Sequence, residues 1–159
     1  MDKLLIAEAS KHLRLRSINL WESNLTRFEP LPETGELGQQ IKLSVKSDTI
    51  GISSIEQPAS TLRVLVDLGI RIVNPAVQAE TDPTPLFQIE ASFQVDYELT
   101  SSVEQAALDE FTRFNAVHNV WPFWRQYVFS TANQAGLPCP EVPLNTSLQS
   151  LENLSQASV

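Results

Sequence analysis

Side chains that could act as nucleophiles, general bases or metal ligands are few in this chain. There is one cysteine, Cys139, and there are two histidines, His12 and His118. Cys139 lies between two prolines and has no basic neighbour in sequence that would favour its reactive thiolate form. Neither histidine has an acid at the spacing of a catalytic pair, and no serine sits in a nucleophile-elbow motif. The sequence therefore predicts no catalytic residue and no metal site.

The glycines do not form a phosphate-binding loop. The five of them fit neither the P-loop nor the dinucleotide-binding motif: Gly35, Gly38, Gly51, Gly69 and Gly136. We therefore expect no cofactor and no enzyme activity. The alternative is an acyl-thioester hydrolase, or a small-ligand-binding protein, in which a helix lies across a curved antiparallel sheet. Such a hydrolase needs an acid on its central helix, but the helix expected over 120–135 contains no Asp or Glu.

Aromatic side chains are concentrated in that expected helix. Five fall within nine residues and cannot all point the same way: Trp121, Phe123, Trp124, Tyr127 and Phe129. One face of the helix can pack on a sheet, and the other needs a second cover. Either the rest of the chain supplies that cover or a second copy or a partner does. We favour oligomerisation, because the open edges of a small sheet also need pairing or protection.

A second group of apolar residues lies in a long connection over 25–38. Phe28, Leu31 and Leu37 could each anchor this connection to the body of the protein. Together with the leucines near the C-terminus, they could instead line a shallow groove for extended, unfolded polypeptide, which needs no catalytic group. Irregular connections of this length in small domains are often functional, so we treat the connection as a candidate site.

Alternation of apolar and polar residues predicts four strands. They cover 12–24, 39–53, 62–72 and 87–99. A short proline-rich segment joins the last two, which favours an antiparallel hairpin. The apolar positions change parity between Leu15 and Ile18, and again between Ser47 and Thr49. Each change predicts a β-bulge.

Helical spacing replaces the alternation after the fourth strand. Ser101 and Glu104 offer a capping box for a first helix. The main helix is expected over 120–135, with Pro122 in its first turn and Gly136 as the left-handed residue after its last turn. The two helical segments together cover about 102–135.

The leucines near the C-terminus predict a last short amphipathic helix over about 146–155. The expected fold is therefore α+β, with a four-stranded antiparallel sheet over about 12–100, a long helix packed on one face and a short C-terminal helix. We expect residues 1–159 to form a single domain, since 159 residues rarely build two cores.

The composition of the chain limits the kinds of partner that we expect it to bind. Eleven Lys and Arg against nineteen Asp and Glu give a net charge of −8, which would repel nucleic acid. Hydrophobic residues make up 42% of the chain, which is typical of a globular protein. The apolar run at the start, Leu4–Ala7, is too short for a secretory signal, and no segment approaches a membrane span. With a single cysteine, the sequence favours a cytoplasmic protein that does not insert into membranes.

The stretch VWPFWRQYVFSTANQAGLPCPEVPL follows the four expected strands and precedes the short amphipathic tail. It resembles the SecB family of protein-export chaperones. In that family a hydrophobic residue, a proline, an aromatic residue and an arginine open the main helix, and a glycine stop and a leucine-bearing, proline-containing passage follow. The matching positions here are Trp121, Pro122, Phe123, Arg125, Gly136, Pro138, Pro143 and Leu144.

The resemblance implies a subunit whose first strands pair across a dimer and whose main helices join two dimers into a homotetramer. It also implies an ATP-independent holdase, which keeps preproteins unfolded in hydrophobic grooves beneath the connection after the first strand and beside the last helix. Carried onto this chain, the groove residues are Phe28, Leu31, Leu37, Leu148 and Leu151. The interface residues on the main helix are Trp124, Tyr127, Val128 and Thr131.

The chain departs from the family where export chaperones dock the secretion motor ATPase through acids on the outer sheet surface. Ser17 and Trp21 occupy the two acidic positions of the first strand. Glu22 is displaced by one residue, which predicts that it points to the other face. Glu80 and Asp82 supply part of an acidic patch. We therefore expect a holdase for unfolded polypeptides, whose clients are preproteins for export or an antitoxin-type protein.

Overall fold

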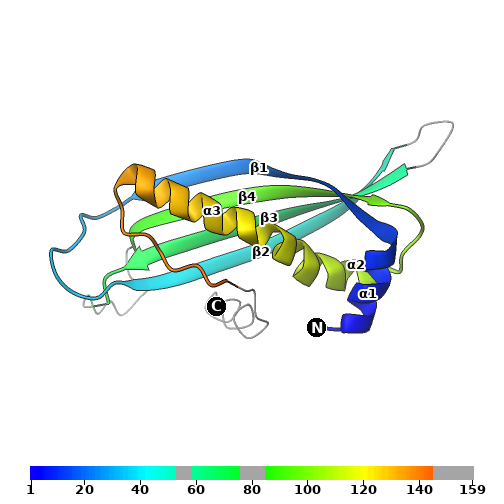
Figure 1. Ribbon diagram of the computed structural model, residues 1–159, viewed down its shortest axis with the longest axis horizontal. Helices are drawn as coiled ribbons and strands as arrows, with labels where there is room; N and C mark the ends of the chain where they lie inside the picture. The colour runs from blue at the N-terminus through cyan, green and yellow to red at the C-terminus, as the bar shows by residue number, and fades with distance from the viewer. Residues whose placement is uncertain (53–58, 76–84, 145–159) are drawn as a thin grey trace.

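A computed structural model describes residues 1–52, 59–75 and 85–144. Four strands form one antiparallel sheet in the order β1-β4-β3-β2 (Figure 1). They are β1 (Leu13–Arg27), β2 (Gly38–Ile52), β3 (Ala59–Val73) and β4 (Pro85–Leu99). One long helix crosses a single face of the sheet. The predicted α+β class, the sheet and the long helix are confirmed, whereas the expected helix over 146–155 lies outside the described residues.

In the two central strands, β3 and β4, the alternation of apolar and polar residues in the sequence matches the burial of their side chains. Over 62–72 and 87–97 every second residue is buried on the helix side, while the residues between them, apart from the buried Gly69, are partly exposed on the outer side. On that outer side, Nε and Nη2 of Arg63 each donate to a carboxylate oxygen of Asp96 at 2.8 Å. A planar guanidinium matches a carboxylate in this bidentate geometry.

This pair predicts an acid-sensitive contribution to stability. Hydrogen bonds from Arg63 lower the pKa of Asp96 below its ordinary value. The contribution is therefore fully present above the unfolded-state pKa of about 3.9 and is lost as the pH falls through the lower folded-state pKa. We expect the stability difference between wild type and Asp96→Asn, measured by urea unfolding, to shrink from neutral pH toward about pH 3. A difference that stays constant over this range would contradict the assignment.

Strand β1 contains two bulges. The pairing with β4 shifts between Leu15 and Ser17, as the parity change predicted, and shifts again between Leu20 and Glu22. The second bulge, at Trp21, was not predicted, and it corrects the placement of Glu22. Since Ser17 pairs with Asp96 and Glu22 pairs with Ser92, both lie on the outer face of the sheet.

The bulge predicted in β2 is wrong. The pairing of β2 with β3 runs without a shift through Ser47, Asp48 and Thr49. Ile50 therefore pairs with Thr61 on the outer face. One apolar side chain near the end of an edge strand can stay partly exposed, so it does not force the backbone to change register.

The long helix is continuous from Gln105 to Ala135, in three parts. These are α2 (Gln105–Glu110), a π-helical turn η1 (Phe111–Ala116) and α3 (Val117–Ala135). The predicted capping box is wrong, because Glu104 is the N-cap without a side-chain bond and Ser101 Oγ lies 2.7 Å from Nδ1 of His12. Pro122 lies inside α3 rather than in a first turn, because the helix reaches the proline through η1 without a break.

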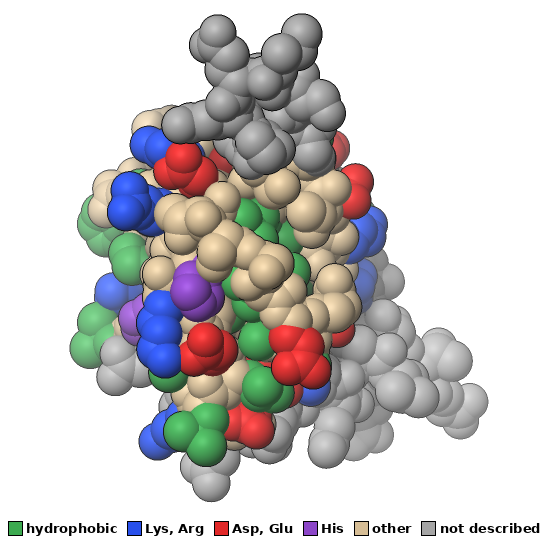
Figure 2. Space-filling model, turned by 90° about the vertical axis from the view of Figure 1, so that its right-hand side faces the viewer, with side chains coloured by type: hydrophobic (Ala, Val, Ile, Leu, Met, Phe, Trp, Pro, Cys, Tyr) green, Lys and Arg blue, Asp and Glu red, His purple; other side chains and the backbone are tan. Residues whose placement is uncertain are grey.

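A helix at the N-terminus, α1 (Lys3–His12), was not predicted. Asp2 caps it by accepting hydrogen bonds from the amides of Leu4 and Leu5 at 2.9 and 3.3 Å. Ala9 is buried in the core, while Leu4 is exposed. Seen from this end, the molecule shows acidic and basic side chains around smaller hydrophobic areas (Figure 2). No helix in the described ranges is both long and apolar enough to cross a bilayer.

The core lies between the sheet and one face of α3. Trp124 and Val128 have no exposed surface within the protomer. Both were expected at an oligomer interface, and that expectation is wrong, because a side chain enclosed by its own chain cannot contact a second copy. Tyr127 and Thr131 are partly exposed, and their place at an interface stays a prediction.

Candidate functional site

A small hollow lies where three distant parts of the chain meet, at the end of the molecule that carries the β1–β2 connection (Figure 1). It is surrounded by the first residues of that connection, by the start of β4 and by the residue that follows the turn at the end of α3. Its volume is about 290 Å³. The lining residues are Arg27, Phe28, Glu29, Pro30, Leu31, Leu86, Phe87 and Leu137.

The hollow has a buried apolar floor and an exposed apolar rim. Leu86, Phe87 and Leu137 form the floor and are almost completely buried. Phe28 and Leu31 form the rim, with 45% and 36% of their surface exposed. A guest side chain that enters the hollow would cover these two rim residues and leave water itself, which is the burial that drives hydrophobic association.

Backbone hydrogen bonds hold the rim in place. The amides of Phe28 and Glu29 both donate to the carbonyl of Leu86, at 2.9 and 3.2 Å. The guanidinium of Arg27 donates to the carbonyl of Ala135 at the end of α3. The start of the connection is thereby tied to both β4 and α3, so the rim is preformed at this side.

The end of α3 directs Leu137 into the floor. Gly136 adopts the predicted left-handed conformation, with φ 63° and ψ 33°. Its amide donates to the carbonyl of Asn133 at 3.1 Å, and the amide of Leu137 donates to that of Ala132 at 2.9 Å. This pair of bonds is the Schellman motif, which turns the next apolar side chain back onto the structure.

The structure thus brings together two of the five predicted groove residues. Phe28 and Leu31 line the hollow, whereas Leu37 is exposed but does not line it. Leu148 and Leu151 lie outside the described residues, as do the acids Glu80 and Asp82. The floor was missed, because Leu86, Phe87 and Leu137 carry only strand and helix-end signals in the sequence.

Comparison with known proteins shows which fold this arrangement resembles. No protein-family model matches the chain, and no curated protein matches it. Among solved structures, the chain is similar to the SecB-like chaperone Rv1957 of Mycobacterium tuberculosis, solved in complex with a ChAD peptide from the antitoxin HigA1. The TM-score is 0.65 at 15% sequence identity, and the match covers 91% of this chain and 99% of the other. The chain has a SecB-like fold.

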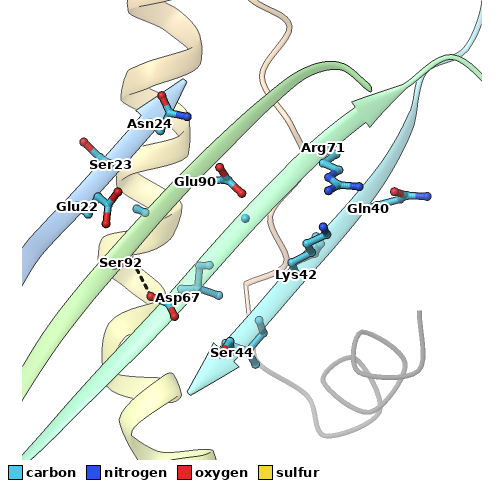
Figure 3. A pocket seen from close by; sticks show the side chains of 15 residues that line it. Glu22, Ser23, Asn24, Gln40, Lys42, Ser44, Asp67, Arg71, Glu90 and Ser92 are labelled. Carbon is cyan, nitrogen blue, oxygen red and sulfur yellow. Dashed lines mark hydrogen bonds between the residues drawn. The ribbon is translucent and has the colours of Figure 1, made fainter. Parts of the chain in front are cut away.

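The outer face of this SecB-like sheet carries a second, open hollow of about 1200 Å³ (Figure 3). Its lining includes the acids Glu22, Asp67 and Glu90 on strands β1, β3 and β4 and the bases Lys42 on β2 and Arg71 on β3. Ser92 Oγ donates to Asp67 at 2.5 Å. Charges of both signs therefore line the hollow, and Glu22 belongs to it because of the bulge at Trp21.

Two further apolar areas lie away from the hollows of the SecB-like protomer. On β1, at one edge of the sheet, Leu15, Leu20 and Trp21 are about half exposed or more. On the outward face of α3, Phe123 and Phe129 are 50% and 54% exposed. The described part of the protomer therefore leaves large apolar side chains uncovered at its surface, as the crowded aromatic residues of the helix predicted.

Proposed function

We propose that the protein is an ATP-independent chaperone that binds non-native polypeptide in the cytoplasm and holds it without covalent chemistry. The observation that carries this proposal is the apolar hollow, with the half-exposed Phe28 and Leu31 standing over a buried floor. The fold supports it, since the similar structure is that of a SecB-like chaperone bound to a peptide from an antitoxin.

Several weak contacts would act together in such binding. Full burial of one client side chain contributes about 1.5–3 kcal/mol. The exposed residues of β1 and α3 offer additional contacts, so a long client gains avidity that a short peptide does not. The net charge of −8 favours basic or neutral clients by long-range attraction.

The test is the double variant Phe28→Ser with Leu31→Ser. We expect its Kd for a short apolar peptide to rise about tenfold to a hundredfold, because two partly exposed rim contacts are lost. Its ability to suppress aggregation of an unfolded substrate should fall as well. Fluorescence anisotropy of a labelled peptide and light scattering during substrate dilution measure the two effects.

The matched control is Leu4→Ser, which removes an apolar side chain that is 82% exposed on α1, at the other end of the molecule. It should bind peptide like the wild type. Binding that is equal in all three proteins would contradict the hollow as the site, and wild-type protein that neither binds peptide nor delays aggregation would contradict the proposed function.

Docking to the secretion motor ATPase is a second candidate role. It is favoured by one observation, that Glu22 lies with Asp67 and Glu90 on the outer face. We expect Glu22→Gln to weaken binding of the motor severalfold without changing peptide binding. If the wild type and the variant bind the motor equally, Glu22 takes no part in docking, and a wild type that does not bind the motor contradicts this role.

A further inference from the structure

The backbone of residues 141–143 is held between α3 and the edge strand β2 (Figure 1). The side chain of Gln39, on β2, donates to the carbonyl of Glu141 at 2.8 Å and accepts from its amide at 3.1 Å. From α3, Arg125 donates to the carbonyl of Val142 at 3.3 Å and Trp121 donates to that of Pro143 at 2.8 Å. We call residues 140–143 the strap.

The hydrogen bonds of the strap are made by its backbone, while Pro140 is buried and Val142 packs against the core. Three consecutive carbonyls are each bound by a side-chain donor, and Gln39 makes the paired donor and acceptor contacts that a neighbouring strand would make. The side chain of Glu141 is exposed and takes no part. A channel that binds carbonyls in this way accepts an extended chain of many sequences, as in other modes of peptide recognition.

Prolines in and next to the strap favour an extended backbone. Pro138, Pro140 and Pro143 fix their own φ angles, and each restricts the residue before it to extended conformations. Ordering such a segment costs little entropy, so a few hydrogen bonds suffice to hold it. A competing chain must therefore replace these hydrogen bonds together with the apolar contacts of Pro140 and Val142.

The strap and the apolar hollow are covalently linked. Leu137 belongs to the floor of the hollow and is followed, across Pro138 and Cys139, by the strap. A client that enters the hollow therefore lies next to the start of the strap. The client chain can continue into the channel between α3 and β2 only if the strap moves out of that channel.

We propose that the channel between α3 and β2, built from Gln39, Trp121 and Arg125, is a second binding site for extended polypeptide. The strap fills it as an internal substitute until a client displaces it. The client segment is extended and uncharged, with free carbonyls for the three donors. This inference rests on the proposed function and adds a site and its internal competitor.

Amide hydrogen exchange of the wild-type chain tests the displacement. The amide of Glu141 donates a hydrogen bond to Gln39 in the free protein. With a saturating amount of a reduced, carboxymethylated and permanently unfolded protein, we expect this amide to exchange at least about tenfold faster, because its bonded state is lost. Client that binds with no change at Glu141 overturns the inference and leaves the proposed function intact. An absence of any client binding overturns the proposed function, and the inference with it.

A variant of the strap tests the competition without altering the channel. Pro143→Gly keeps the carbonyl that Trp121 binds but frees the backbone of the strap. It should loosen the strap and tighten client binding about twofold to fivefold. Pro75→Gly, an exposed proline after β3, is the matched control and should bind client like the wild type. Client binding of Pro143→Gly that equals the control, or is weaker, overturns the competition.

Discussion

Trp124→Ala is expected to lower the free energy of unfolding by about 3–5 kcal/mol, the largest expected effect on the stability of the protomer. Trp124 has no exposed surface, and its ring stacks on Tyr127 with 6.2 Å between centroids. Its removal leaves a cavity between α3 and the sheet. Its indole N–H has no hydrogen-bond partner among the described residues, so the loss is one of packing. Urea unfolding followed by circular dichroism measures the change.

Phe123→Ala is the matched control, because Phe123 is the neighbouring aromatic residue on the same helix and is 50% exposed. Its effect on protomer stability should stay within about 0.5 kcal/mol, as for most surface substitutions. The difference in stability between the two variants distinguishes the buried face of α3 from its exposed face. If both variants were destabilised equally, or if Trp124→Ala were as stable as the wild type, the placement of Trp124 in the core would be contradicted.

The same residue shows where sequence reasoning ends. The helical spacing of Val120, Trp124 and Val128 correctly identifies them as one stripe. Spacing alone does not say whether that stripe meets the chain's own sheet or a second subunit, since both are apolar surfaces. The structure decides by completely burying the stripe and leaving Phe123 and Phe129 outward.

The strands were predictable because each has one face that packs toward the core, fully buried in β3 and β4 and partly buried in β1 and β2. In β3 and β4 the alternation persists along most of the strand, and the register follows from it. In the edge strands β1 and β2 the alternation predicts the register less well, because fewer of their side chains are buried. The parity change after Leu15 therefore marks a real bulge in β1. The similar change at Thr49 in β2 marks no bulge and only leaves Ile50 partly exposed on the outer face.

The candidate site was predictable in part for a related reason. Apolar residues in an irregular connection, such as Phe28 and Leu31, are unusual enough to be noticed in a sequence. The floor beneath them, Leu86, Phe87 and Leu137, consists of ordinary core residues from the start of β4 and the end of α3. Only the tertiary fold brings these segments together, so no local pattern distinguishes them from the rest of the core.

The double variant Phe123→Ser with Phe129→Ser is expected to weaken association between subunits by about a hundredfold or more. Each ring is about half exposed, so its burial at an interface contributes roughly half of 1.5–3 kcal/mol. Two such rings on each of two facing subunits then add about 3–6 kcal/mol, and 1.4 kcal/mol is tenfold in Kd. Light scattering of both proteins over a range of concentrations measures the change in mass.

The product of that dissociation distinguishes the two apolar areas. If α3 joins two dimers, as the resemblance implies, the variant should stop at the mass of a dimer, because the edge strand β1 with Leu20 and Trp21 is untouched. Trp21→Ser should then act on the remaining contact and yield monomer when it is combined with the double variant. A wild type that is monomeric, or a double variant of unchanged mass, would mean that the exposed rings of α3 do not meet another copy. They would then be free to contact the client itself.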